Sequence, residues 1–461
     1  MPTKATFVTF TVQPDGNDLN GGAFKRGASG TDASGDDDPI CTIDGSTITA
    51  STYGDQSLNV VGYDVSSSDV GNCLFGQMDD SSSHWVQTGP IASVDTTNNR
   101  WTWDQDQSWA WISGATEFTS ARLGGALATP GGLADPSGGV GRMGNDCVAY
   151  IKAGTYTMTS SDAESQGRFQ AGSRRVSLVA YKTTPGDHFE NTGDLVIIDT
   201  GSTANDSNGV IYFSNDDSLC WVTGVEVRGN DTWSTGFSGR CSVSNCVAKN
   251  LTGCGFSLNP VSTAFSSRAV DCGTSGTNSG FSSGFCTECI AIDCEASGFR
   301  FPVGAVRCVS HGGTNGFELY DFDSATACVA DGASVGFKSA TNVYDARVTN
   351  SVAINCTTGL TNLADGGGNA FYNNTANFST TNSLTHVNEK QLTADPFNDA
   401  PNQDYTINSD SGGGADLAER SPKFGAGVSE GGPQQQQSAQ LKSTGGGSST
   451  VVAPGPVQIG M

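Results

Sequence analysis

The sequence predicts an all-β chain in which a right-handed, single-stranded parallel β-helix solenoid follows a small β-rich N-terminal domain. Three observations indicate this fold class: a loose repeat of about twenty residues, short apolar runs within each repeat, and a high glycine content. Gly is 61 of 461 residues, and only 36% of the residues are hydrophobic. This composition suits a solenoid, because a thin core shared by successive coils needs few inward side chains.

A Gly-Phe pair marks each unit of the repeat. The pairs begin at Gly236, Gly255, Gly280, Gly298, Gly316 and Gly336, and Gly359-Leu360 closes the series. Their spacings of 19, 25, 18, 18, 20 and 23 residues indicate loops of different length on an otherwise regular coil. Equivalent positions on successive coils of a β-helix stack about 4.8 Å apart. We therefore expect the Phe residues to form an aromatic ladder and each Gly to supply a sharp corner.

The apolar runs between these pairs are predicted to be strands. Cys289–Ile292 and Val352–Ile354 are typical, and none of the runs carries the i, i+3, i+4, i+7 stripe of a helix. Gly, Ser, Thr, Asn and Asp fill the intervals, and these residues suit turns. Leucine-rich repeats have a similar period but need a Leu lattice that this sequence lacks.

Composition divides the chain into three segments. Residues 1–120 lie outside the repeat and are predicted to form a β-rich attachment or capping domain. The β-helix is expected over residues 121–427. Residues 428–461 are rich in Gly, Ser and Gln, which predicts a flexible C-terminal tail. The strands expected in the first segment are Phe7–Val12, Leu58–Val61 and Cys73–Phe75.

The fourteen cysteines allow two interpretations. Two rows recur at equivalent repeat positions: Cys246, Cys289, Cys308 and Cys328 in one, and Cys272, Cys294 and Cys356 in the other. Such rows favour a ladder of reduced, buried thiols that fill a narrow core. The alternative is zinc, since Cys286 and Cys289 have the C-x2-C spacing of a metal knuckle, but no partner pair stands nearby.

Four tryptophans form the strongest local pattern of the N-terminal segment. Trp101, Trp103, Trp109 and Trp111 alternate on either side of a polar five-residue turn, which predicts a β-hairpin with one aromatic face. That face is either a hydrophobic core or subunit interface, or a platform on which sugar rings stack.

Acidic clusters supply the candidate metal and catalytic residues. Asp15, Asn17 and Asp18 could hold Ca²⁺ through hard oxygen ligands, or form a turn with Asx hydrogen bonds. A glycoside hydrolase needs two carboxylates across a sugar-binding groove. The candidates in neighbouring coils are Asp271, Asp293, Glu295, Asp321, Asp323 and Asp331, with His311 as a possible partner in catalysis. The alternative is a solvated row of turn residues.

Several motifs resemble a known superfamily. Ala149-Tyr-Ile-Lys-Ala-Gly-Thr-Tyr156 looks like the opening coil of pectate-lyase-like β-helix proteins, and Asp395-Pro-Phe397 through Tyr405 is similar to their closing segment. Asp18–Gly22 and Arg122–Leu127 resemble β-helix proteins encoded by tailed bacteriophages and metagenomic phage contigs. The resemblance implies a virion protein of the tail or capsid surface and assigns no catalytic residue. The breakers within Gly131–Pro136 disfavour a capping helix, so the N-terminal domain is expected to cover that end.

Charge and the N-terminus restrict the partners. The chain has 23 basic and 47 acidic residues, a net charge of −24, which argues against binding nucleic acid or an anionic membrane. No stretch approaches the length of an apolar membrane span, and Met1–Thr6 lack the apolar run of a secretory signal. We expect a protein that folds in the host cytoplasm without a cofactor, and then resides on the virion.

Two functions follow as hypotheses. The first is a non-catalytic structural or adhesion protein of a phage particle, either a capsid decoration or a component like a tail spike or fibre. It would form a homotrimer, contact other virion proteins and offer a surface to a host glycan. The second is a tailspike-like polysaccharide depolymerase, a glycoside hydrolase or lyase. A fold hosts many chemistries, so only the site can separate the two.

Overall fold

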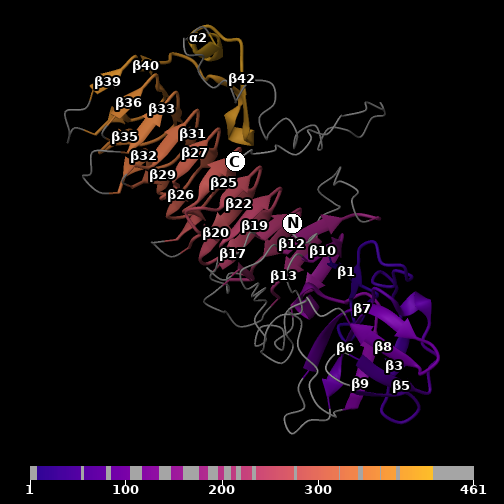
Figure 1. Ribbon diagram of the computed structural model, residues 1–461. Coiled ribbons are helices and arrows are strands. Elements are labelled where there is room, and N and C mark those ends of the chain that lie inside the picture. The colour runs from indigo at the N-terminus through magenta and orange to yellow at the C-terminus, as the bar shows by residue number, and fades with distance from the viewer. Residues whose placement is uncertain are drawn as a thin grey trace.

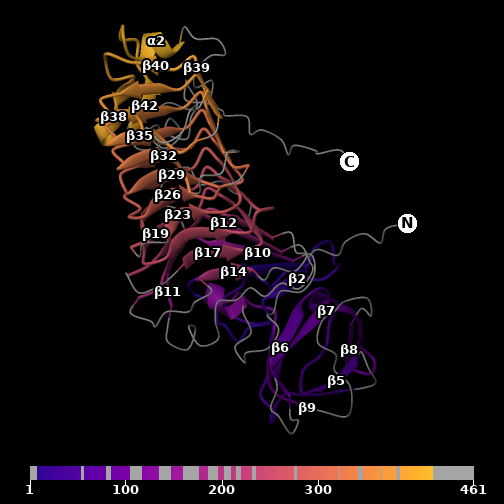
Figure 2. The same ribbon diagram turned by 90° about the vertical axis from the view of Figure 1, so that its left-hand side faces the viewer.

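The computed structural model is a parallel β-helix joined to a small antiparallel unit, which confirms the predicted fold class. It describes residues 8–52, 57–78, 85–103, 117–133, 147–158, 176–184, 196–201, 209–213, 220–230, 235–274, 278–320, 322–340, 346–363, 365–379 and 385–418. Figures 1 and 2 show the solenoid as an elongated stack, with the N-terminal unit at one end.

Three sheets run along the solenoid, and each coil from β12 to β38 contributes one strand to each sheet; the pairing is parallel throughout except for β2 at the first edge. Sheet 1 contains, in spatial order, β2 (Ala23–Lys25), β1 (Val8–Val12), β10 (Cys147–Lys152), β12 (Val176–Tyr181), β15 (Cys220–Thr223), β18 (Cys241–Ser244), β21 (Thr263–Phe265), β24 (Phe285–Thr287), β27 (Gly304–Val306), β30 (Ser324–Thr326), β33 (Arg347–Thr349), β36 (Asp365–Gly367) and β39 (Thr385–Val387). Sheet 2 contains β11 (Gly154–Thr157), β13 (Val196–Asp199), β16 (Val225–Arg228), β19 (Val247–Leu251), β22 (Arg268–Cys272), β25 (Ile290–Ile292), β28 (Val309–His311), β31 (Val329–Asp331), β34 (Val352–Ile354), β37 (Ala370–Tyr372) and β40 (Lys390–Gln391). Sheet 3 contains β14 (Ile211–Phe213), β17 (Thr235–Gly239), β20 (Cys254–Leu258), β23 (Ser279–Ser282), β26 (Ser297–Arg300), β29 (Asn315–Leu319), β32 (Val335–Ser339), β35 (Thr358–Thr361) and β38 (Ala376–Phe378).

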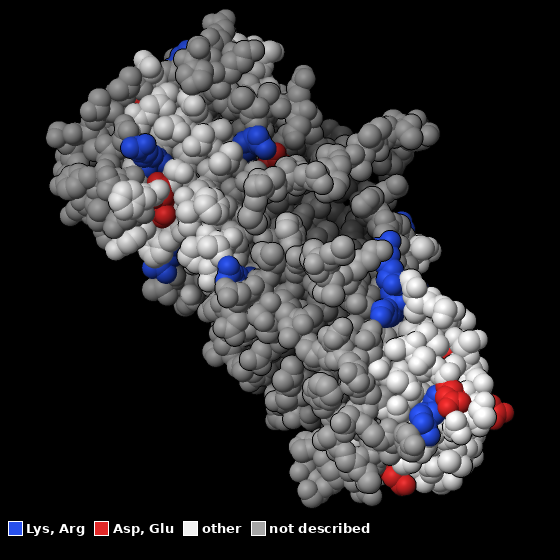
Figure 3. Space-filling model, in the orientation of Figure 1, with Lys and Arg blue, Asp and Glu red and all other residues white. Residues whose placement is uncertain are grey.

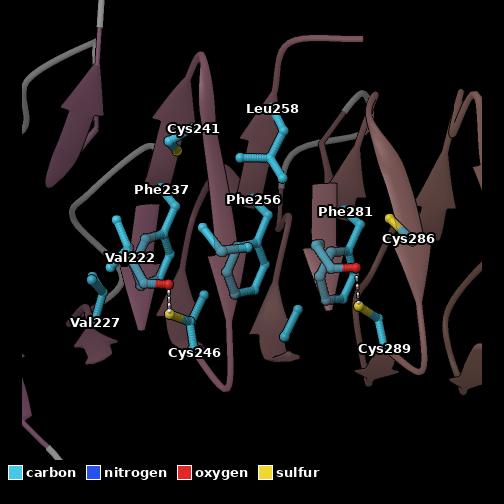
Figure 4. Close-up of a cluster of buried hydrophobic side chains, with 14 of the residues drawn as sticks. Val222, Val227, Phe237, Cys241, Cys246, Phe256, Leu258, Phe281, Cys286 and Cys289 are labelled. Carbon is cyan, nitrogen blue, oxygen red and sulfur yellow. Dashed lines mark hydrogen bonds between the residues drawn. The ribbon is translucent and has the colours of Figure 1, made fainter. Parts of the chain in front are cut away.

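The predicted aromatic ladder fills the core. Six phenylalanines stack with ring centroids 4.8, 4.6, 4.9, 4.7 and 4.9 Å apart: Phe237, Phe256, Phe281, Phe299, Phe317 and Phe337. Figure 4 shows the first three rings in a row, from left to right. Leu360 pairs with Phe337 and continues the column, as the Gly-Leu pair suggests. Stacked rings at this spacing bury large apolar area and add a specific ring–ring attraction.

The glycines that precede these rings do not form the corners, contrary to our prediction. They lie inside the strands of sheet 3, where a Cβ on Gly280 would come within 2.8 Å of the Gly298 carbonyl oxygen. The corner between sheets 2 and 3 is instead formed by residues in the left-handed conformation, including Asn250, Asp271 and Asp293, with φ of 54°, 48° and 50°. Asn and Asp tolerate this conformation, because their side chains can bond to the local backbone.

The cysteine rows form the predicted ladder of buried thiols, and all fourteen cysteines are free. Cys308 donates its thiol to the Cys286 and Val306 carbonyl oxygens at 3.4 Å each, and Cys328 repeats this one coil further along. Figure 4 shows the same contact at Cys246 and Cys289. Burial raises the pKa of the Cys246 thiol to about 12, so it stays protonated and packs as a small apolar group.

The N-terminal unit is a closed antiparallel barrel. Its strands are β3 (Cys41–Ile43), β9 (Glu117–Leu123), β4 (Thr49–Thr52), β5 (Ser57–Val61), β8 (Arg100–Trp103), β7 (Trp85–Asp95) and β6 (Cys73–Met78), and β9 also pairs with β6. The strands expected at Leu58–Val61 and Cys73–Phe75 are therefore present. Closure leaves few exposed edges, which a small β unit needs to remain separate from other sheets.

The first strand of the chain belongs to the solenoid, although it lies within residues 1–120. Strand β1 pairs in parallel with β10, and β2 pairs antiparallel with β1, so the two cover the first edge of sheet 1. The segment in which we expected no capping α-helix begins with a short 3-10 turn, η3 (Pro130–Leu133). A second such turn, η2 (Ser67–Asp69), lies within the barrel segment. Trp109, Trp111 and the predicted tail 428–461 lie outside the described residues.

The C-terminal segment folds back over the outer face of sheet 2. It comprises β41 (Phe397–Asp399), η5 (Ala400–Asn402), β42 (Asp404–Ile407) and α2 (Gly414–Ala418); β41 and β42 pair as an antiparallel hairpin. Figure 1 shows α2 near β40 at the end of the solenoid and β42 beside the coils that precede it. Its buried side chains Phe397, Tyr405 and Leu417 form one apolar cluster with Ile292 and Val329 of sheet 2. Sheet 2 is therefore covered on both faces over these coils.

Candidate functional site

The candidate site lies where the C-terminal hairpin covers sheet 2. Strand register places Ile292, His311, Asp331 and Ile354 in one outward column of successive coils. His311 and Asp331 are thus polar residues within an otherwise apolar stripe. A polar pair at such a place costs free energy unless its hydrogen bonds are satisfied.

The Asp331 carboxylate receives three donors from three elements. Tyr405 donates its hydroxyl to Oδ2 at 2.8 Å, and Asn355 donates its side-chain amide to Oδ1 at 2.9 Å. His311 Nδ1 lies 3.2 Å from Oδ2 and 2.9 Å from the Tyr405 hydroxyl oxygen. Asp331 is 3% exposed and Tyr405 1% exposed. We call Asp331, His311 and Tyr405 the hairpin latch, because they join sheet 2 to β42.

Hydrogen bonding, burial and negative charge together shift the pKa values of the latch and of nearby Asp395. The hydrogen bond to Asp331 raises the pKa of His311 against the opposing effect of burial, and the charges of Asp331 and Asp293 act in the same direction. Burial, followed by the Asp331 charge, raises the pKa of Tyr405. Burial likewise raises the pKa of Asp395, with a further contribution from Asp331. His311 is therefore the group whose charge changes near neutral pH.

We expect the stability of the hairpin to fall as pH rises through the raised pKa of His311. The folded state holds the proton more tightly than the unfolded state, whose His pKa is about 6.5. The added stability is therefore fully present below that value and is lost above the raised one. Thermal unfolding of the protein and of a His311→Gln variant is measured from mildly acidic to mildly alkaline pH. The difference between their unfolding midpoints is expected to shrink as pH rises, because it reports the stability added by protonated His311. A difference that does not change with pH would refute it.

The latch also has an open side. The His311 side chain is 25% exposed, and no described residue bonds its Nε2. The Asp293 carboxylate lies against the coil that carries His311, since a Cβ on Gly312 would stand 2.6 Å from Asp293 Oδ1. An imidazole held by a buried carboxylate can exchange a proton with a bound group, which is the arrangement that acid–base catalysis uses.

Three of the remaining sequence candidates are surface residues at or beside the corners, and Asp323 is buried. Asp271, Asp293 and Glu295 are exposed, and Asp271 and Asp293 occupy equivalent left-handed corners of adjacent coils. Asp331 does not share their column, because it aligns with Ile292 and therefore stands one position before the corner. Asp323 is buried and accepts a hydrogen bond from the Tyr320 backbone N–H at 2.6 Å. Asp321 lies outside the described residues.

Trp101 and Trp103 lie in the barrel interior rather than on a sugar-binding surface. Their exposed fractions are 0% and 8%, and both belong to the barrel's hydrophobic cluster. Trp101 Nε1 donates to the buried Asp69 carboxylate at 2.8 Å. Strand β8, the first half of the predicted tryptophan hairpin, pairs with β5 and β7, which both precede it in the chain. The second half of that hairpin, with Trp109 and Trp111, lies outside the described residues. A sugar ring could stack on these two side chains only if the barrel opened.

The acidic loop near the N-terminus forms one Asx turn, at Asn17, and its Asp18 carboxylate joins the loop to residues 128 and 129. Asp18 Oδ1 accepts the Ala128 and Thr129 backbone N–H groups at 2.9 and 2.8 Å, and Oδ2 accepts the Thr129 hydroxyl at 2.8 Å. Asn17 Oδ1 accepts the Leu19 N–H at 2.9 Å. Within the part of the chain that the structure describes, no three His, Cys, Asp or Glu side chains gather in a way that could hold a metal ion.

Tyr405 is the member of the site that the sequence did not reveal. It lies 74 residues after Asp331 and 94 after His311, outside the repeat. The signal that could have pointed to it is its place in a polar closing segment, Gln403–Tyr405, directly after the last coils.

Among the described residues, no helix is long and apolar enough to cross a membrane.

Comparison with known proteins finds only weak structural similarities. No family model and no curated protein matches it. Among solved structures, the A-module of the Azotobacter vinelandii mannuronan C-5 epimerase AlgE4 aligns with a TM-score of 0.30 and 11% identity, over 53% of this chain and 91% of that one. The catalytic domain of a GH87 alpha-1,3-glucanase, in complex with tetrasaccharides, aligns with a TM-score of 0.28 and 11% identity, over 82% and 90%.

Proposed function

We propose that this chain is a structural and adhesion protein of a bacteriophage particle. In this proposal it is made in the host cytoplasm and carried on the virion, as a capsid decoration or as part of a tail spike or fibre. The phage assignment rests on the N-terminal motifs described above. The solenoid serves as a stiff spacer, and a host surface glycan is the candidate ligand of its exposed faces.

The observation that supports a non-catalytic role is that the buried polar groups of the latch are bonded to one another. Asp331 and Tyr405 are almost fully buried, and each bonds within the latch. Such groups fasten the hairpin and do not meet a substrate. The exposed carboxylates Asp271 and Asp293 stand at corners where Asn250 and Asn355 serve equally well, so the backbone geometry explains them.

A polysaccharide depolymerase is the second candidate, and the open Nε2 of His311 beside Asp293 favours it. In that case His311 would act in one of two ways while Asp331 orients its ring. It would donate a proton to the glycosidic oxygen as the glycosidic C–O bond breaks and water adds to the sugar, or it would remove a proton from a sugar carbon as that bond breaks by elimination. Removal of a general acid or base typically costs about 10²–10⁴ in rate.

One pair of measurements separates the two. Purified full-length protein is incubated with capsule or cell-wall polysaccharide, and new reducing ends and unsaturated sugars are measured for the wild type, His311→Gln and Asp293→Asn. The structural proposal expects no products from any of them, together with antibody labelling of phage particles. Products that fall about a hundredfold in His311→Gln would establish the enzyme instead. Particles that carry no label would refute the virion assignment.

A further inference from the structure

The solenoid exposes large apolar side chains in one place. Ten such residues are well exposed among the described residues, and six of them fall between positions 261 and 322. These six form what we call the apolar patch: Val261 (62% exposed), Phe265 (45%), Phe285 (45%), Val306 (38%), Tyr320 (43%) and Phe322 (80%). Single exposed hydrophobic residues need no explanation, but a cluster marks an interaction surface.

Strand register makes the patch continuous. Phe265, Thr287 and Val306 stand in one outward column of sheet 1, in three successive coils. Phe285 lies in the neighbouring column, and its ring rests over Gly304, 3.3 Å from where a Cβ would stand. Val261, Tyr320 and Phe322 occupy the turns that lead from sheet 3 into the same strands. The patch therefore spans sheet 1 and the adjoining corner over four coils, roughly 14 Å along the stack.

The outward strand positions of sheet 1 around the patch carry no charge, and the Glu288–Arg307 ion pair lies at the corner that follows these strands. From β15 to β30, its outward residues are Trp221, Thr223, Ser242, Ser244, Thr263, Phe265, Phe285, Thr287, Gly304, Val306, Ser324 and Thr326. The next strand begins with Arg347. An uncharged face over six strands is unusual in a chain whose net charge is −24. On the side drawn in Figure 3, the described charged residues are scattered over the surface.

We propose that the apolar patch is the surface on which a second copy of this chain docks. Two copies that each have a net charge of −24 repel one another, so a stable contact between them has to exclude acidic side chains. The uncharged face of sheet 1 meets that requirement, and burial of its aromatic rings supplies the favourable free energy. This inference goes beyond the proposed function and does not depend on it.

The test is the mass of the full-length protein in solution. Sedimentation equilibrium at micromolar concentration is expected to show an oligomer for the wild type and a monomer for Phe265→Glu, which places a charge in the patch. Phe285→Thr, which introduces the residue type found at the nearby outward positions Thr263 and Thr287, is expected to weaken association about tenfold. Val61→Glu, at a position in the barrel that is 64% exposed, is the matched control and should keep the wild-type mass.

Salt gives an independent readout. Association through an uncharged patch strengthens as salt screens the repulsion between copies, whereas association through ion pairs weakens. A wild-type monomer at micromolar concentration, including one that binds a glycan or another protein at this patch, would overturn the proposal. So would a Phe265→Glu variant that is folded by circular dichroism and retains the wild-type mass.

Discussion

Replacement of Asp331 by alanine is expected to release the C-terminal hairpin while the solenoid stays folded. The change removes the acceptor that the Tyr405 hydroxyl, His311 Nδ1 and the Asn355 amide share. Tyr405 is 1% exposed, so its hydroxyl would be left buried with an incomplete set of partners. A buried partner left in this way costs about 1–3 kcal/mol, and loss of a buried charged network costs more, so we expect about 3 kcal/mol.

Amide hydrogen exchange measures this effect where it arises. Opening of the hairpin should become about a hundredfold more frequent, visible as faster exchange in β41 and β42, with little change in the ladder strands of sheet 3. Asp271→Asn is the matched control, because it removes an exposed carboxylate at a corner that asparagine occupies in other coils. Unchanged exchange in β41 and β42 of the Asp331→Ala protein would show that the latch does not hold the hairpin.

The largest loss of global stability is expected for Phe281→Ala. Phe281 is 1% exposed and stacks between Phe256 and Phe299, at 4.6 and 4.9 Å. Truncation of a buried phenylalanine removes its transfer free energy and leaves a cavity, at a cost of about 3–5 kcal/mol. Each coil of a solenoid contacts only its neighbours, so a gap at one coil weakens the coupling between the two halves.

Urea unfolding followed by circular dichroism tests this prediction. The midpoint should fall strongly for Phe281→Ala, and the transition is expected to broaden if the two halves unfold separately. Phe285→Ala, four residues further on and 45% exposed, is the control and should change stability by about 0.5 kcal/mol or less at concentrations where the chain is monomeric. Equal midpoints for the two variants would mean that the ladder contributes no more than a surface side chain.

The ladder, the thiol rows and the coil period could all be predicted, because each depends on a pattern that recurs along the sequence. Phe237 and Phe256 are 19 residues apart, and they meet because the coil repeats at that spacing. The corners were assigned to the wrong residues for a local reason. A recurring Gly suits either a corner or a place where two backbones approach closely, and here the glycines before the Phe ladder serve the second purpose. The left-handed corners are formed by residues such as Asn250 and Asp293.

The sequence by itself thus determined the β-helix, its core column and its reduced cysteines, since these follow from short-range periodicity and side-chain chemistry. Only the tertiary structure decided that Tyr405 reaches back across 74 residues to Asp331, and that His311 joins them. It also decided that Trp101 is enclosed in a barrel and that Phe265 and Val306 share an exposed face. These contacts depend on where a non-repeating segment folds and on strand register, and the free energy of such long-range packing leaves no periodic trace in the chain.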